Sequence, residues 1–466
     1  MRRNIVYTLL LAISPTLAHA QSETVTLAQC RELALNHNKE VAKSKVQDEQ
    51  LGYDVKTYKS NFFPRINLQA FDVYSTAKGD LTISGGNLPI YSYTSAVGQY
   101  VPDVTVNADG SYTLNKYALF PDQKMEYKVK NVFMGGINLT QPIYMGGKVS
   151  SAYKMAKTGK EMSALNIALT ESDIIVKTEE AYFLAVKAKE MIKVANKYKD
   201  LLQELMKNVE SAFKHGLKTR NDMMKVQVKL NEADLNITKA ENAYRLACMN
   251  LCHYIGKPLS SSIDVTDANV TDAQANANAN SQIDITHRTE YEILNKKVEL
   301  AGQQVSLTRS DYLPNVVFMG GFLYANGGEV GGRKLIDNAS AYASIGVSVP
   351  LLNFGESTNK VRSAKAKQQI AQLERDDLNE QMMLEQQQAL NNLEEAKKEV
   401  NLTNSAFDQA EENMRLSKQQ YEVGFETLSD YLEAQAIWQS SYANKIDAIC
   451  QLNLAWVKYQ KARGEL

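Results

Sequence analysis

Two long stretches of the chain, residues 143–257 and 351–466, contain no proline and little glycine. Both residue types penalise the interior of a helix, so their absence favours long helices. Apolar residues also recur every seven positions, a spacing typical of coiled coils when it is sustained over this many turns. One such series is Leu393, Val400, Phe407, Met414 and Tyr421.

The glycines that flank these helices set their length. From Gly147 to Gly216 there are 69 residues, and the same spacing separates Gly355 from Gly424. At about 1.5 Å per residue, each helix can reach roughly 100 Å. No globular core needs helices of that length, so the sequence predicts an elongated helical bundle.

The two helical stretches belong to the two halves of a tandem duplication. A shift of 250 residues places six residues of the segment 37–64 on identical residues of 287–314, and a shift of 208 does the same for six residues of 142–256 on 350–464. The shifts differ by 42 residues, so the first half contains an insertion of that length between Pro64 and Pro142. The predicted organisation is a first repeat over 21–256, a linker over 257–282 and a second repeat over 283–466.

Each half also contains two segments in which apolar and polar residues alternate, as expected of strands that are covered by apolar surroundings on one face. Their lengths approach the 9–11 residues of a transmembrane strand. Between the second pair, the glycine-rich run Gly327–Gly332 predicts a loop. Between the first pair, residues of about 75–130 predict either a long extracellular loop or an extension of the strands beyond the membrane. The alternating segments begin near Ile66, Ile137, Val316 and Ala341.

Beyond residue 20 the sequence contains no apolar run of the ~20 residues needed for a membrane-spanning helix. A chain of this kind enters a membrane only as a closed β-barrel, because lipid cannot satisfy an open sheet edge. Four strands are too few to close a barrel, so several chains must contribute to it.

The first 20 residues have the features of a secretory signal peptide: Arg2 and Arg3, then an apolar run, then Ala18-His19-Ala20. Cys30 lies too far past the cleavage point for lipid attachment. Cys248 and Cys252 are one helical turn apart and are predicted to pack as small apolar residues. Cys450 has no metal-ligand spacing to a histidine.

The composition gives no support to an enzyme or a nucleic-acid-binding protein. The formal net charge is −1 with 23% charged residues, so no basic surface is indicated. No arrangement of nucleophile and base is evident, and the five histidines are scattered. We therefore expect no catalytic residues, no cofactor and no metal site.

The whole plan resembles the TolC family of outer-membrane efflux proteins. The most specific match is the aromatic-x-x-Gly…Asp turn at the end of each long helix, formed by Phe213, Gly216 and Asp222 in the first half and by Tyr421, Gly424 and Asp430 in the second. The resemblance implies a homotrimer with a twelve-stranded β-barrel, four strands per chain, in the outer membrane of a Gram-negative bacterium. A long periplasmic α-helical coiled-coil barrel continues it.

The resemblance also implies partners and residue roles. A periplasmic adaptor (membrane fusion) protein and an inner-membrane pump of the RND, ABC or MFS type would engage the helix tips, and outer-membrane lipid would surround the barrel. Asp430 and Glu433 match the periplasmic gate, and Asp222 and Tyr421 match a lock between neighbouring hairpins. The adaptor-docking tips correspond to Gly216, Leu217, Val423, Gly424 and Phe425.

One position departs from the family pattern. Glu426 stands where the best-known member has an arginine of the lock, so that salt link does not carry over. A simpler role is also open for both aspartates. Thr219 and Thr427 each precede an aspartate by three residues, the signature of a helix N-cap. Asp222 and Asp430 then serve as caps, alone or in addition to their family roles.

Two other functions remain to be weighed against small-molecule efflux. The same fold serves as the outer-membrane duct of a protein-secretion system. A periplasmic coiled-coil scaffold without a pore is the third, and the strand pairs at equivalent places in both halves argue against it.

Overall fold

A computed structural model describes residues 23–266 and 283–466; the predicted signal peptide lies outside the described residues. The chain divides into two compact units. A helical unit contains the described parts of 23–55, 154–305 and 362–466, and a strand unit contains 56–153 and 306–361. Several helices continue across the boundary in the sequence, and each unit is described by itself below.

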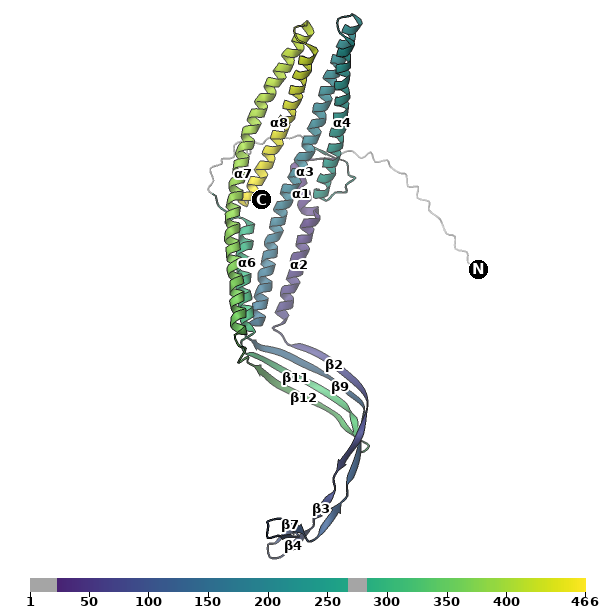
Figure 1. Cartoon of the computed structure of the whole chain (residues 1–466), viewed down its shortest axis with the longest axis vertical. Coiled ribbons are helices and arrows are strands. Elements are labelled where there is room, and N and C mark those ends of the chain that lie inside the picture. The colour runs from purple at the N-terminus through teal and green to yellow at the C-terminus, as the bar shows by residue number, and fades with distance from the viewer. Residues whose placement is uncertain (1–22, 267–282) are drawn as a thin grey trace, which may run out of the picture. The chain divides into compact units, whose positions relative to one another are not determined.

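The strand unit is built on a four-stranded antiparallel sheet (Figure 1). Its order is β12-β11-β9-β2, so β12 and β2 form the two open edges. In the single chain, alternate side chains such as Leu68 and Ile345 are 78% and 65% exposed. The strands are β2 (Arg65–Ile83), β9 (Gln123–Met145), β11 (Asn315–Val330) and β12 (Arg333–Ser348).

The predicted loop over Gly327–Gly332 is wrong for most of its length. Strand β11 continues to Val330, and the turn consists of Gly331 and Gly332, which have φ angles of 57° and 81°. Gly327 stays in the strand because β9 approaches it closely: a Cβ there would lie 2.3 Å from the Asn131 carbonyl oxygen. Glycine in a strand often marks such an approach at a register shift.

Most of the insertion is also strand rather than loop. Strands β2 and β9 stay paired as far as Ile83 and Gln123. Residues 84–122, which we call the arm, form three two-stranded sheets, because threonine, tyrosine and valine favour extended backbone. Its strands are β3 (Gly86–Pro89), β4 (Tyr91–Thr94), β5 (Gln99–Pro102), β6 (Val104–Val106), β7 (Tyr112–Leu114) and β8 (Tyr117–Phe120).

The helical unit repeats one plan twice, as the duplication predicts. Helices α3 and α7 contain 67 and 68 residues, and each is followed by a returning helix of 36 residues. The bounds are α1 (Leu27–His37), α2 (Lys39–Ser60), α3 (Lys148–Lys214), α4 (Arg220–Ile255), α6 (Thr289–Ser310), α7 (Glu356–Val423) and α8 (Leu428–Arg463).

The repeated glycines at the ends of α4 and α8 have a steric explanation. Gly256 and Gly464 have φ angles of 73° and 74°, which only glycine adopts without strain. A Cβ on Gly256 would lie 2.5 Å from the His37 carbonyl oxygen, and one on Gly464 would lie 2.7 Å from that of His287. The duplicated His–Gly pairs are therefore places where two backbones touch.

The predicted linker is only partly a linker. Ile263 and Val265 belong to strand β10 (Ile263–Val265), which pairs in parallel with β1 (Glu23–Val25). Both side chains are buried, so the short apolar alternation is covered by the helices around it. The rest of the predicted linker, residues 267–282, lies outside the described residues.

The main core of the helical unit contains all four cysteines, which are free and buried. Burial raises the pKa of the Cys30 thiol to about 12 and that of Cys450 to about 11. Packing of Cys248 and Cys252 as small apolar residues is confirmed, since they are 8% and 0% exposed. Among the described helices, none has both the length and the apolar character needed to cross a membrane.

Candidate functional site at the helix tips

The two hairpin tips have the same backbone conformation. Gly216 and Gly424 end the outgoing helices with φ angles of 74° and 83°. The amide of the next residue then donates to a carbonyl five residues back: Leu217 to Ala212, and Phe425 to Gln420, each at 2.9 Å. This is the usual way to satisfy helix-ending carbonyls around a left-handed glycine.

The returning helices begin with the predicted capping boxes. The Thr219 hydroxyl accepts from the Asp222 amide at 3.2 Å, and the Asp222 carboxylate accepts from the Thr219 amide at 3.0 Å. Thr427 and Asp430 make the same pair of bonds at 3.3 and 3.1 Å. Both aspartates therefore serve as helix caps.

The electrostatic surroundings of the two aspartates differ. The Thr219 amide and hydroxyl hold the pKa of Asp222 below its usual value, and Lys218 and Lys225 lower it further. The pKa of Asp430 is lowered by the Thr427 hydroxyl and amide. Asp430 and Glu433 are both exposed at the start of α8, one helical turn apart.

A small core holds the two tips of one chain together. Leu428 and Tyr431 of α8 are 3% and 4% exposed and pack against Leu205 and Val209 of α3 and Val226 of α4. This core is not part of the tip motif. The signal was present in the repeat, where the apolar Leu428 stands at the position of the charged Arg220.

Tyr421, one of the predicted lock residues, lies in this core. Its ring stacks on that of Tyr431 with centroids 5.4 Å apart, and the Lys218 ammonium lies 4.7 Å from its centroid. Burial raises the pKa of Tyr421, and the negative charge of Asp222 raises it further. Asp222 therefore lies near enough to Tyr421 for its charge to act on the phenol, and the structure gives no direct bond between the two side chains.

Two further links between the hairpins were not predicted. The Lys225 ammonium donates to the Ser429 hydroxyl at 3.3 Å, joining α4 to α8. The Lys418 ammonium lies 3.0 Å from the Glu204 carboxylate, joining α7 to α3. Both are surface contacts between side chains with no motif of their own, so only the packing of the helices reveals them.

Glu426, the departure from the family pattern, turns back onto its own hairpin. Its carboxylate accepts a hydrogen bond from the Ser417 hydroxyl of α7. Ser417 is buried. The carboxylate is thus bound within the α7–α8 tip.

Three of the five predicted docking residues are the most exposed apolar side chains of the tips, and the other two are the glycines of the turns. Leu217, Val423 and Phe425 are 77%, 68% and 84% exposed. Leu217 lies at the α3–α4 tip, and Val423 and Phe425 lie at the α7–α8 tip.

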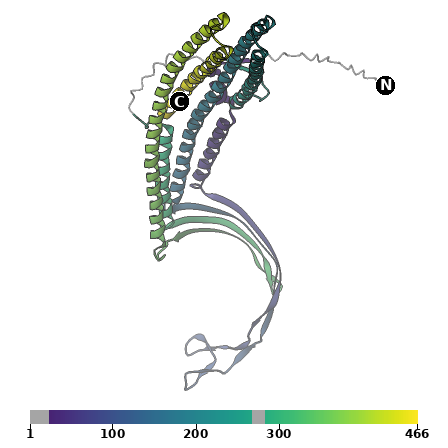
Figure 2. The ribbon, with the colours of Figure 1, turned by 45° about the horizontal axis from the view of Figure 1, so that its top comes forward.

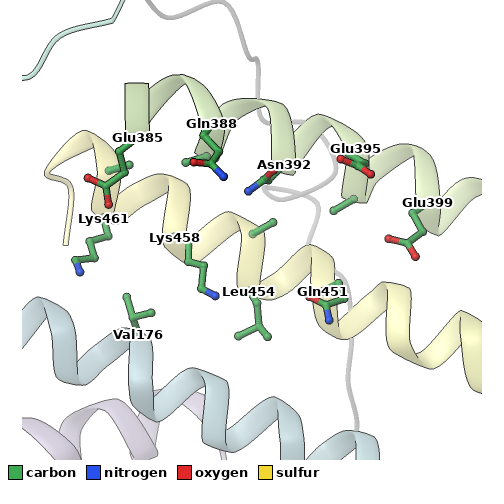
Figure 3. Close-up of a pocket in the computed structure, with 14 residues that line it drawn as sticks. Val176, Glu385, Gln388, Asn392, Glu395, Glu399, Gln451, Leu454, Lys458 and Lys461 are labelled. Atoms are coloured by element: carbon green, nitrogen blue, oxygen red, sulfur yellow. The ribbon is translucent and has the colours of Figure 1, made fainter. Parts of the chain in front are cut away.

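A groove farther along the helical unit is a less suitable site (Figure 3). Carboxylates of α7 line one wall, and Lys458 and Lys461 extend from α8 toward α3. The two lysines are already paired, with Glu180 at 2.7 Å and Asp173 at 2.5 Å. Among the residues described, no group of histidine, cysteine and carboxylate side chains is arranged to hold a metal ion.

Each half of the chain contributes a long helical hairpin with a capped tip and two strands of the four-stranded antiparallel sheet. This architecture is that of an outer-membrane channel subunit. The family model for the outer membrane efflux protein matches residues 91–257 and 294–465, and the chain belongs to this family. The resemblance to the TolC family is confirmed, as is the outer-membrane location with an extension into the periplasm.

Individual relatives agree. The outer membrane protein TolC of Vibrio cholerae is 19% identical over 377 residues, which cover 80% of this chain and 84% of that protein. The alkaline protease secretion protein AprF of Pseudomonas aeruginosa is 21% identical over 346 residues, covering 72% and 70%.

A solved structure confirms the fold class. The outer membrane protein VceC of Vibrio cholerae superimposes with a TM-score of 0.71 at 15% identity, covering 94% of this chain and 96% of that one. The fold is that of TolC-like channels, with a strand part and a long helical part.

Proposed function

We propose that three copies of this chain form the exit duct of a tripartite efflux system, which conducts small molecules passively out of the cell. The observation that carries the proposal is the α7–α8 tip, where Asp430 and Glu433 are exposed and no lysine or arginine lies between residues 421 and 433. In a three-fold ring these two carboxylates become six, and a ring of carboxylates favours cations.

The open edges of the sheet support the trimer. Strands β2 and β12 leave their outer hydrogen-bonding groups without a partner in the four-stranded sheet. In lipid such groups must be paired, and pairing β12 of one copy with β2 of the next closes a twelve-stranded barrel from three copies.

The apolar tips support docking of a periplasmic adaptor, which in turn engages a pump of the RND, ABC or MFS type. Leu217, Val423 and Phe425 supply the exposed contact, and Gly216 and Gly424 supply the turns that present it. Asp222 and Tyr421 act as the lock. The tip core holds the resting state in place of the family salt link that Glu426 removes, and the exposed Lys418–Glu204 pair adds only a small, salt-screened contribution.

A protein-secretion duct is the second candidate function. It is favoured by the likeness to AprF, whose name describes secretion of a protease. The tip geometry serves both uses, since the cargo is selected by the pump.

The test is cation block of single channels in planar bilayers. Asp430→Asn with Glu433→Gln removes the charges while keeping the side-chain shapes. We expect higher conductance and at least about tenfold weaker block by a trivalent cation, because charged rings concentrate counter-ions. Alanine at both positions should act in the same direction.

The matched control is Glu210→Gln, which removes an exposed carboxylate from the other hairpin at a position to which no role is assigned. It should leave cation block unchanged. If the double variant conducts and is blocked like the unmodified channel, Asp430 and Glu433 do not line the aperture.

A further inference from the structure

The arm lacks the buried interior that its strands would need if they stood alone in water. Across residues 61–145, all of them described, no residue is buried. Isolated two-stranded sheets are at best marginally stable in water. The arm's three sheets therefore depend on a surface outside the chain.

The β4–β5 hairpin shows which face that surface covers. Tyr93 pairs across the hairpin with Tyr100, and Tyr91 with Pro102, so the three tyrosines share one face. They are 59%, 61% and 70% exposed at positions 91, 93 and 100, and the rings of Tyr93 and Tyr100 meet edge to face at 5.4 Å. We call this the tyrosine face.

The opposite face of the hairpin is mostly polar and yet better covered, except at the exposed Gln99 beside the turn. Ser92, Thr94 and Val101 are only partly exposed. An antiparallel pair with one covered face normally covers its apolar side and solvates its polar side. Here the order is reversed, so the tyrosine face is the side left for a partner.

Membrane lipid is not that partner. Two aromatic residues of β9, Phe133 and Tyr144, are 11 positions apart, which matches the span of a transmembrane strand between aromatic girdles. Phe133 lies opposite Asp72 of β2, and β2 continues for 11 further residues to Ile83. At ~3.4 Å per residue, the arm therefore begins roughly 35 Å along the strand from the Phe133–Asp72 pair, the outer of the two aromatic positions.

The intervening rungs carry charges on one face of the β2–β9 pair. Lys78 lies opposite Lys128, and Asp80 opposite Glu126. Charged side chains are unfavourable on the lipid-facing side of a strand, so this face of the two strands lies against water. The tyrosine face is consequently exposed to water unless a protein or a glycan covers it.

The place where the arm joins the sheet favours a second copy of the chain as the partner of the tyrosine face. The arm grows from β2 and β9, and β2 is the edge strand that meets the next copy in the proposed trimer. In Figures 1 and 2 the arm follows the bend of the sheet, and its end turns toward the concave side. Strands of a closed barrel coil about its axis, so the concave side is the one that faces the axis.

Charge also permits contact between copies. The arm contains Asp103, Asp109, Lys116 and Asp122 as its charged residues, a net charge of −2 in 39 residues. None lies on the tyrosine face. Tyrosine supplies large contact area with little loss of side-chain freedom, and it is enriched at protein interfaces.

We propose that the tyrosine face docks on the arm of a second copy of this chain, so that three arms meet over the outer mouth of the channel. This rests on the proposed trimer. It assigns the insertion a role in closing the outer end, separate from the gate at the helix tips.

The test is photo-cross-linking of the full-length protein in detergent, with benzoylphenylalanine at position 100. The matched control carries the same probe at Tyr112 of β7, which is also 70% exposed. After irradiation and denaturation, position 100 should give covalent dimers and trimers of the chain, and position 112 should give few.

A second variant tests the face itself. With the probe at Val97 in the β4–β5 turn, Tyr91→Ser, Tyr93→Ser and Tyr100→Ser together should reduce cross-linking about tenfold or more, since truncating a tyrosine in an interface commonly costs a factor of ten in affinity. Tyr112→Ser should leave cross-linking unchanged.

The outcomes separate this proposal from the one on which it rests. If the mass in detergent is that of three chains while position 100 cross-links only to lipopolysaccharide or to nothing, the arms do not meet and the inference is wrong. If the mass is that of one chain, the trimer and the arm contact are both wrong.

Discussion

The α3–α4 and α7–α8 tips have the same backbone and opposite charge. Each has a left-handed glycine, a threonine cap and an aspartate three residues later. Residues 213–225 nevertheless contain four lysines or arginines and one acidic residue, whereas residues 421–433 contain four acidic residues and no lysine or arginine.

The comparison separates the residues that the turn requires from the charges that are free to vary between the two tips. Glycine and the capping box recur because a tight helical hairpin needs them. The charges have no such backbone requirement, so they are free to differ after duplication. The difference leaves the α7–α8 tip with four acidic residues and no lysine or arginine, and it leaves Asp222 among lysines.

The largest expected difference between the tips comes from Leu428 and its repeat counterpart Arg220. Leu428→Ala should destabilise the first turns of α8 by about 2–5 kcal/mol, because it opens a cavity in the tip core. Arg220→Ala, at an exposed position, should cost less than about 0.5 kcal/mol in α4. Native-state hydrogen exchange of each helix start measures both. Equal losses would show that the core does not favour one tip.

Loss of the threonine caps should affect the two tips alike. Thr219→Ala and Thr427→Ala should each cost about 1 kcal/mol of local stability, since each removes the acceptor for one helix-end amide. The same exchange measurement reports the loss, and serine at either position should restore most of it. Clearly unequal stability losses would mean that the two turns are strained to different degrees despite their similar backbone geometry.

Acid should weaken both caps, by less than loss of the threonine. Because the folded-state pKa values of Asp222 and Asp430 lie below the ordinary value of 3.8, their contribution is complete above that pH and is lost as the pH falls through the folded values. Exchange protection at the two helix starts, corrected for intrinsic rates, should be constant from pH 7 to about 5 and decline below about 4. Asp430→Asn should remove the decline at α8 alone. A decline that begins near neutral pH would point to another group.

The smallest effect is expected from the link between the hairpins. Lys418→Ala should cost less than about 1 kcal/mol, because Lys418 and Glu204 are 36% and 55% exposed and solvent screens the pair. High salt should remove the difference from the unmodified protein. Local exchange in α3 near Glu204 measures it. A larger, salt-independent loss would assign the pair a structural role that its exposure does not suggest.

Much of the fold could be predicted from the sequence because its signals are local. Missing proline and a heptad repeat determine where the long helices run, and Gly216 and Gly424 mark where they end. The caps at Asp222 and Asp430 were predicted from three-residue spacing, since a capping box closes within one turn. The loop predicted for Gly327–Gly332 was mostly wrong. In sequence, a glycine that allows a neighbouring strand to approach looks the same as a glycine that forms a turn.

The sequence by itself determined the repeated plan, the helix ends and the two caps, since each depends on residues close together in the chain. Only the tertiary structure decided which side chains meet across hairpins: Leu428 in the tip core, Tyr421 on Tyr431, and Lys418 with Glu204. It also decided that the β4–β5 hairpin leaves its tyrosines uncovered. Contacts of that kind join residues that are far apart in sequence, and their energy depends on packing and burial that no local pattern encodes.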